Sequence, residues 1–301
     1  MAEVHGILNL IKPLDWTSME VVRLVKRLTG QRRVGHAGTL DPQATGVLPI
    51  CLGQATRVME YLINNHKSYR FVVRLGVATD TYDSEGKIVS DLDASYVSRD
   101  DVERSLNAFR GTFLQVPPMY SALKVGGTRL YSLARAGKEV DRKPREVESY
   151  SIDITAWNHP DVEIEIECGR GLYVRSLAHD IGVALECGAS IKSLTRLTCG
   201  PFDIASAATI QDLEDAFQNE SWKALVFPID FPLLKLKAGM VGGDKELAIR
   251  QGQGVYIGLS NLMNNQDITL RMYNVRGEFF ALMRQDRVRG KWRARKVFSL
   301  N

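Results

Sequence analysis

Apolar and polar residues alternate along several stretches of the chain, and this pattern predicts β-strands. In Tyr69–Leu75 every second residue is apolar or aromatic, and in Val162–Cys168 apolar residues alternate with three glutamates. A period of two is typical of strands that bury one face. The mainly apolar run Gly6–Lys12 is predicted to be a short strand ended by Pro13, and Val47–Gly53 is predicted to be a buried strand.

Other stretches repeat their apolar residues every three to four positions, which predicts helices. The first helix is bounded by recognisable end signals, since Thr17 and Glu20 form a capping-box pattern and Gly30 is a typical stop. Asp101–Phe109 is a second predicted helix. A third follows the turn at residues 169–171 and carries the apolar stripe Val174, Leu177, Ala178, Ile181 and Leu185.

Alternating strands mixed with several helices predict an α+β fold around a largely antiparallel sheet. The segment FPIDFPLL, residues 227–234, carries two prolines and is predicted to join two domains. Beyond it, Gly252–Gly258, Ile268–Val275 and Gly277–Met283 are predicted to be strands of a small β domain. The predicted boundaries are 1–232 for the large domain and 233–301 for the small one.

The net charge of +4 is small, but basic residues gather in two places. The first group, between Ser121 and Arg145, comprises Lys124, Arg129, Arg135, Lys138, Arg142, Lys143 and Arg145. The second, near the C-terminus, comprises Arg284, Arg287, Arg289, Lys291, Arg293, Arg295 and Lys296. Two basic groups on a nearly neutral chain indicate a polyanionic partner, although each group alone equally suits an ordinary solvated surface.

The sequence carries no pattern typical of a metal, a nucleotide cofactor or a membrane span. The cysteines Cys51, Cys168, Cys187 and Cys199 are widely spaced, so reduced, buried thiols are expected and a zinc site is not. The motifs GxxxxGK[ST], GxGxxG, GxSxG and HExxH are absent. No signal-peptide run or long apolar segment is present, and no heptad pattern requires a dimer. We therefore expect a cytoplasmic monomer that works with side chains alone and needs no cofactor.

The stretch GHAGTLDPQATGVLP, residues 35–49, sets one acid, Asp41, and one imidazole, His36, among glycines and other turn-forming residues. Asp before Pro often starts a turn, which is the plain structural interpretation. A carboxylate on a glycine-rich loop that a large ligand can approach also suits a nucleophile. In a pocket, such a carboxylate needs a cationic partner to stay ionised.

Three further residues each have a structural and a functional interpretation. Arg175 begins a predicted helix directly after a strand, so its side chain either reaches a cleft at the end of the sheet and pairs with Asp41 or faces solvent. Tyr69 either packs in the core or stacks on a nucleobase. His36 either contacts a base or phosphate or bonds the backbone of its own loop.

Residues 35–49 closely resemble the catalytic motif of the bacterial TruB family of tRNA pseudouridine synthases, which make pseudouridine 55 in the T-loop. Four further segments agree in order, and together they span residues 6–202: GILNLIKPLDWTS, KSYRFVVRLGVATDTYDSEG, QVPPMYSALKVGGTRLYSLARAG, and CGRGLYVRSLAHDIG followed by LTRLTCGPF. The resemblance implies the pseudouridine-synthase α+β fold with a long mixed, mainly antiparallel sheet. It implies more loosely a small PUA-like C-terminal domain.

The resemblance also implies roles for individual residues. Asp41 matches the catalytic aspartate, Arg175 the arginine that pairs with it, and Tyr69 a tyrosine that stacks on the target uracil and is proposed to act as a base. The implied substrate contacts are His36 to the T-loop, Leu194 in the uracil pocket, and Lys12 with Pro13 in support of the active-site loop. The basic residues from 121 to 145 fall in an insertion that closes over the T-loop.

The implied reaction is the isomerisation of uridine to pseudouridine in the T-arm of tRNA, after the base has been flipped out of its stack. Whether Asp41 attacks C1′, adds to C6 or removes a proton at C2′ stays open at this point. Two alternatives remain: a tRNA-binding folding chaperone without catalysis, and a synthase acting on another uridine in a T-loop-like RNA.

Overall fold

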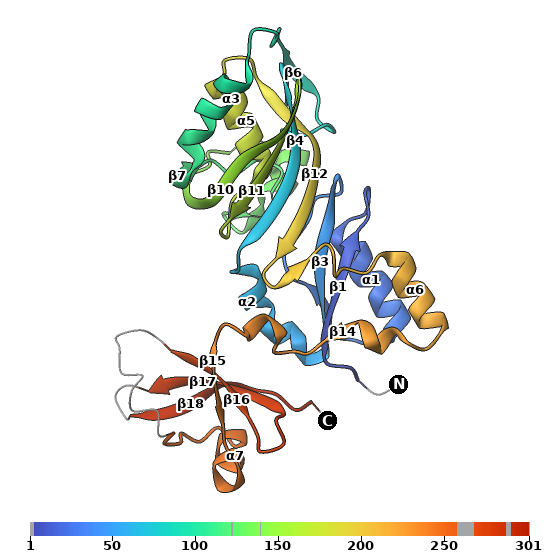
Figure 1. The fold of residues 1–301 in the computed structure, drawn as a ribbon, viewed down its shortest axis with the longest axis vertical. Helices are drawn as coiled ribbons and strands as arrows, with labels where there is room; N and C mark the ends of the chain where they lie inside the picture. The colour runs from blue at the N-terminus through green and yellow to red at the C-terminus, as the bar shows by residue number, and fades with distance from the viewer. Residues whose placement is uncertain (1–2, 122, 139, 258–267, 287–289, 301) are drawn as a thin grey trace.

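The computed structural model describes residues 3–121, 123–138, 140–257, 268–286 and 290–300. A ten-stranded sheet of these residues has the order β14-β1-β3-β12-β4-β11-β10-β7, with β2 paired to β3 and β13 paired to β12 (Figure 1). Its strands are β14 (Val226–Phe227), β1 (Gly6–Lys12), β3 (Ala44–Leu52), β12 (Ala189–Cys199), β4 (Lys67–Leu75), β11 (Asp161–Cys168), β10 (Arg145–Asn158), β7 (Gly111–Gln115), β2 (Val34–His36) and β13 (Phe202–Asp203). Only β3 and β12 pair in parallel within this described sheet, so the prediction of a mixed, mainly antiparallel sheet is confirmed.

Helices cover the sheet on both of its halves. Those next to the sheet are α1 (Ser18–Thr29), α3 (Arg99–Leu106), α5 (Val174–Ala184) and α6 (Ile210–Gln218). Helices α3 and α5 lie beside β4, β10 and β11, whereas α1 and α6 lie beside β1 and β3 (Figure 1). The remaining elements of the large domain are η1 (Gly53–Val58), α2 (Met59–Ile63), β5 (Val77–Thr79), β6 (Ile88–Asp91), η2 (Asn107–Phe109), β8 (Lys124–Val125), β9 (Thr128–Arg129), α4 (Leu130–Arg135), η3 (Trp222–Leu225) and η4 (Phe231–Leu233).

The predicted end signals of the first helix are confirmed. Thr17 and Glu20 form a reciprocal capping box, and Gly30 closes α1 in the left-handed conformation at φ 66°. In β4, buried positions alternate with more exposed ones, as the period of two predicts. The predicted helix at Asp101–Phe109 is divided into α3 and the short 3₁₀ turn η2.

Two buried clusters lie on opposite faces of the strands that carry the site. In β1, Leu8 and Leu10 point into the main core with α1, α3 and α5, whereas Ile7 points into a second cluster with η1 and α2. All four cysteines are buried and unpaired, as expected. No helix in the described ranges is both long and apolar enough to cross a membrane.

The C-terminal region forms a small β domain at the end of the molecule opposite β6 (Figure 1). Its elements are β15 (Lys237–Met240), α7 (Gly243–Arg250), β16 (Thr269–Tyr273), β17 (Phe279–Asp286) and β18 (Lys291–Val297). The predicted strand at Gly252–Gly258 is wrong for its described part, because only Val255 forms a bridge, to Trp292. Glycines at 252 and 254 weaken a strand there, and Gly252 adopts a left-handed φ of 77°. Gly258 lies outside the described residues.

The small domain docks on η1 and α2. Phe298 is fully buried in the second cluster, and the Arg57 guanidinium lies 4.9 Å from the centre of its ring. Lys296 Nζ donates to Glu60 Oε1 at 2.7 Å, and Arg295 Nη2 lies 3.5 Å from the same oxygen. Two members of the C-terminal basic group therefore serve a domain interface. Arg287 and Arg289 lie outside the described residues.

Candidate active site

The loop between β2 and β3 carries Asp41 and is held by the N-terminal segment. Lys12 is fully buried, and its Nζ donates to the carbonyl oxygens of Pro13 at 2.7 Å, Trp16 at 2.6 Å and Pro42 at 3.0 Å. Burial lowers the pKa of Lys12 to about 8, against the opposing effect of the Asp41 charge. The ammonium group thus ties the chain after β1 to the residue that follows Asp41.

Arg175 is placed by the docking of α5 against the end of β7. The Gln115 side chain is buried; its Oε1 accepts from Tyr173 N at 2.8 Å, and its Nε2 donates to Tyr173 O at 3.1 Å. Ser176 Oγ donates to Val116 O at 2.8 Å. These bonds fix the first turn of α5, so Arg175 emerges at a defined position. Its interpretation as a solvent-facing residue is wrong, since its side chain is only 7% exposed.

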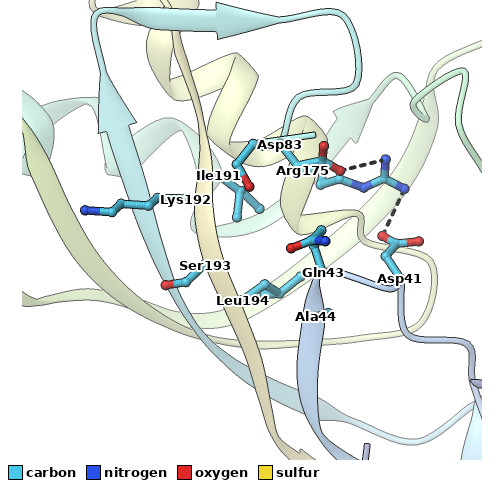
Figure 2. Close-up of a pocket in the computed structure, with 10 residues that line it drawn as sticks. Asp41, Gln43, Ala44, Asp83, Arg175, Ile191, Lys192, Ser193 and Leu194 are labelled. Atoms are coloured by element: carbon cyan, nitrogen blue, oxygen red, sulfur yellow. Dashed lines mark hydrogen bonds and ion pairs between the residues drawn. The ribbon is translucent and has the colours of Figure 1, made fainter. Parts of the chain in front are cut away.

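The guanidinium of Arg175 joins four groups from three segments of the chain. Nη2 lies 2.9 Å from Asp41 Oδ2 and donates to Tyr120 O at 2.7 Å. Nη1 donates to Thr81 O at 3.2 Å and lies 3.4 Å from Asp83 Oδ2. Figure 2 shows the guanidinium between the two carboxylates. The flat, forked geometry of arginine suits such a multiple contact.

Asp83 is a site residue that the sequence analysis missed. Its side chain is 10% exposed; Oδ1 accepts from Thr81 Oγ1 at 2.5 Å and from Glu85 N at 3.2 Å. It lies in a loop of polar residues, so no alternation of apolar and polar positions in the sequence marks its carboxylate as buried. The available signal was its place in the segment TDTYDSEG, which belongs to one of the stretches that carry the family resemblance.

The charges around Asp41 act in opposite directions on its ionisation. Burial raises the pKa of Asp41, the Arg175 guanidinium lowers it, and the negative charge of Asp83 raises it. The Asp41 side chain remains 41% exposed, so one part of the carboxylate faces the solvent side of the site. The arrangement is a carboxylate held in place by an ion pair and accessible to a ligand, which suits a nucleophile or a base.

A small pocket opens beside this ion pair. It is lined by Asp41, Gln43, Ala44, Asp83, Ser84, Arg175, Ile191, Lys192, Ser193 and Leu194. Leu194 is one of these lining residues. The pocket has a volume of about 10 Å³, room for roughly one water molecule. Gln43 Nε2 bridges Asp15 Oδ1 and Glu85 Oε1 at 2.8 Å each, and so links the loop after β1 to the loop between β5 and β6.

Tyr69 and His36 lie next to Arg196 and are not among the described residues that line the pocket. Tyr69 is buried in the main core and bonds the Arg196 side chain, and burial raises its pKa to about 12. Burial and the Arg196 charge lower the pKa of His36, whose Nδ1 has no hydrogen-bond partner within the described part of the chain. Arg196 itself donates to Val47 O at 2.7 Å and Gly38 O at 3.1 Å, beneath the Asp41 loop.

The basic insertion forms the hairpin β8–β9 and helix α4. Lys138, Lys143 and Arg145 are exposed, and Arg142 Nη1 donates to Pro117 O at 3.1 Å. The side chains of Lys124, Arg129 and Arg135 lie outside the described part of the structure. Within the described residues, no three His, Cys, Asp or Glu side chains are grouped so as to hold a metal ion.

Comparisons with known proteins agree with one another. The model of the TruB family pseudouridylate synthase N-terminal domain matches residues 26–174, and the tRNA pseudouridylate synthase B C-terminal domain model matches residues 175–234. A tRNA pseudouridine synthase B of Dehalococcoides mccartyi is 42% identical over 98% of this chain and 97% of its own length. One of Clostridium tetani is 43% identical over 77% of this chain and 79% of its own length.

The fold also matches a solved structure, the "Crystal Structure of a Cbf5-Nop10-Gar1 Complex". One chain of it aligns with a TM-score of 0.73 and 26% identity, covering 98% of this chain and 84% of that one. The similarity therefore extends over the large sheet and the small β domain. Together with the family models and the relatives, it establishes that this chain belongs to the TruB family of pseudouridylate synthases.

Proposed function

We propose that this protein isomerises uridine to pseudouridine at position 55 in the T-loop of tRNA. The observation that carries the proposal is the Asp41–Arg175 ion pair, 2.9 Å long, beside a pocket lined mainly by residues of the segments that carry the family resemblance. The curated relatives named tRNA pseudouridine synthase B support the substrate class.

The reaction breaks the C1′–N1 bond of the uridine, rotates the uracil and forms a C1′–C5 bond. The C5 proton is lost and N1 gains a proton, so the balance closes without an oxidant or a donated group. Asp41 supplies the carboxylate in each of the three routes, whether it attacks C1′, adds to C6 or removes the C2′ proton. Arg175 holds that carboxylate in one orientation, and Leu194 provides an apolar wall for the flipped base.

Tyr69 is proposed to stack on the uracil and to assist proton removal. With a pKa of about 12, its phenol stays protonated at neutral pH. It can therefore accept the C5 proton only if its own proton leaves in the same step. Stacking has no such requirement and contributes roughly 1–3 kcal/mol per base in other nucleic-acid complexes.

The proposed partner is the T-arm of tRNA, bound by a monomer in the cytoplasm. The exposed cations Lys138, Lys143 and Arg145 support phosphate contacts by the insertion, residues 121–145. His36 is proposed to contact the T-loop, and Lys12 with Pro13 to support the loop of Asp41. The domain boundary at 232/233 stays a prediction; the first strand of the small domain begins at Lys237.

Tritium release from tRNA labelled with [5-³H]uridine tests the function. Without added metal or nucleotide, the protein should release the label of one uridine per tRNA. Asp41→Asn should bind tRNA normally and release none. Conversion of uridine by the Asn variant in a single turnover would show that Asp41 is not the catalytic carboxylate. Tight, salt-sensitive tRNA binding without any release by the unaltered protein would instead support the chaperone alternative.

A further inference from the structure

Tyr82 has an unusual backbone conformation immediately beside the Arg175 site. It lies between β5 and β6, at a φ of 66°, in the left-handed region that aromatic residues rarely adopt. The residues on either side of it, Thr81 and Asp83, both contact the guanidinium of Arg175. A strained residue persists only where its surroundings hold it, and such residues cluster at functional sites.

The side chain of Tyr82 is held by a second residue of α5. Its ring stacks on the ring of His179, with centroids 4.0 Å apart and an angle of 13° between the planes. His179 follows Arg175 by four residues, so the two side chains lie one turn apart on the same face of α5. The helix therefore contacts this loop at two points, through the guanidinium and through the stacked rings.

The backbone of Tyr82 is also tied to β12, the strand that carries Leu194. Its carbonyl oxygen accepts from Ile191 N at 3.0 Å, and its own N–H donates to Thr79 O at 3.2 Å. These bonds hold the backbone of Tyr82, and the stack with His179 holds its side chain.

We propose that His179 is a positioning residue for the isomerisation: by stacking on Tyr82 it holds the 81–83 turn, and through it the carboxylate of Asp83 that orients Arg175. The inference rests on the proposed function. His179 is not a catalytic residue, since it is not among the described residues that line the pocket. Burial and the charge of Arg142 lower the pKa of His179, which favours the neutral ring in the stack.

The chain offers a matched control for the loss of a histidine–tyrosine stack. His66 stacks on Tyr150 with centroids 4.2 Å apart and an angle of 23°, and neither ring is among the described pocket-lining residues. Replacing His66 removes a comparable contact without touching the 81–83 turn. Any effect specific to His179 is then separated from a general effect of losing such a stack.

The test measures single-turnover tritium release at saturating enzyme, tRNA affinity and the melting temperature. His179→Ala and His179→Leu should slow release by roughly 10- to 100-fold, the range expected when a reacting group is slightly misplaced. Their tRNA Kd should stay within about twofold of the unaltered value, since neither change removes a phosphate contact. His179→Phe keeps a flat ring and should restore most of the rate, whereas His66→Ala should leave the rate unchanged.

A double-variant cycle with Tyr82 completes the test. If His179 acts only through Tyr82, the double variant Tyr82→Leu/His179→Leu should be no slower than the slower single variant. A normal rate in His179→Leu, a His179→Phe variant as slow as His179→Leu, or multiplicative losses in the double variant would each overturn the inference. Absence of release by the unaltered protein would overturn the proposed function instead, so the two failures are distinct.

Discussion

Replacing Asp83 by Asn tests whether the second carboxylate of the Arg175 site is required. The change keeps the shape of the side chain and removes one negative charge. Its amide oxygen can still accept from Thr81 Oγ1 and Glu85 N, as the carboxylate does now. The amide nitrogen then takes the place of Oδ2, so the substitution removes both the charge and the acceptor that face Arg175 Nη1 at 3.4 Å.

The expected magnitude follows from that distance and from burial. At 3.4 Å and an effective dielectric constant of about 20, two unit charges attract by about 5 kcal/mol. Much of this is offset by desolvation, since the Arg175 and Asp83 side chains are only 7% and 10% exposed. A hydrogen bond to a charged group typically contributes about 1.5–3 kcal/mol net. If Asp83→Asn loses this contribution from the stabilisation of the transition state, the single-turnover rate falls roughly 10- to 150-fold.

The substitution also has a defined effect on pH dependence. The negative charge of Asp83 raises the pKa of Asp41. Removing it lowers the pKa of Asp41, so the carboxylate stays ionised to lower pH. If the reaction needs ionised Asp41, the acidic limb of the rate–pH profile must shift to lower pH, while the maximal rate falls because Arg175 is less well oriented.

The assay is single-turnover tritium release between about pH 5 and 8, with tRNA affinity measured on the same samples. Glu85→Gln is the matched control, because Glu85 lies in the same loop and bonds Gln43, and no contact joins it to Arg175 in the described structure. It should leave both the rate and the acidic limb near those of the unaltered protein. An Asp83→Asn variant with a normal rate and an unmoved acidic limb would refute the reasoning.

Three further predictions follow from the same contacts. Arg175→Lys should lower the single-turnover rate by at least about 100-fold with little change in tRNA Kd. The reason is that the single ammonium group of lysine cannot contact all four groups that the guanidinium contacts, which are Asp41, Thr81 O, Asp83 and Tyr120 O. A near-normal rate would show that the forked geometry of arginine is not needed for the reaction. For Lys12, a pKa of about 8 in the folded state against 10.5 in the unfolded chain means that the unfolded state binds more protons between those values. The free energy of unfolding should therefore rise from pH 8 to 10.5 more in the unaltered protein than in Lys12→Met, as urea titrations at several pH values would show; equal slopes would contradict this. Lys138→Ala and Lys143→Ala should each reduce the log–log salt slope of tRNA binding by roughly 0.7–0.9 and leave the single-turnover rate at saturation intact; an unchanged slope would exclude phosphate contacts at those positions.

Local sequence patterns predicted the elements whose burial is periodic. The strands at Tyr69–Leu75 and Val162–Cys168 and the first helix with its caps were all correct, because alternation and capping are properties of a few neighbouring residues. Strand β12 was missed. It contains two register shifts against β4, and its exposed and buried positions do not alternate, so no period of two was visible.

The sequence predicted only part of the candidate site, because the contacts that assemble it join residues far apart in the chain. Asp41 and Arg175 were named from their segments, but their contact depends on α5 docking against β7 through Gln115, which lies 60 residues before Arg175 and has no local signature. Asp83 was missed because burial of a carboxylate in a polar loop is decided by its distant partner. Long-range pairing therefore limits what one sequence reveals about such a site.

The structure also changes the interpretation of the C-terminal basic group. In sequence, Arg295 and Lys296 belong to one basic group and suggest contact with a polyanion. In the structure, both cations lie against Glu60, Lys296 also donates to Arg57 O, and burial of Phe298 fixes the strand end beside them. A cation that neutralises a carboxylate within the protein contributes much less to the binding of phosphate, because breaking the internal pair offsets the gain. Lys138, Lys143 and Arg145 of the insertion are exposed, so these three should contribute more to the salt dependence of tRNA binding than Lys296 does, and charge counting along the chain could not distinguish them.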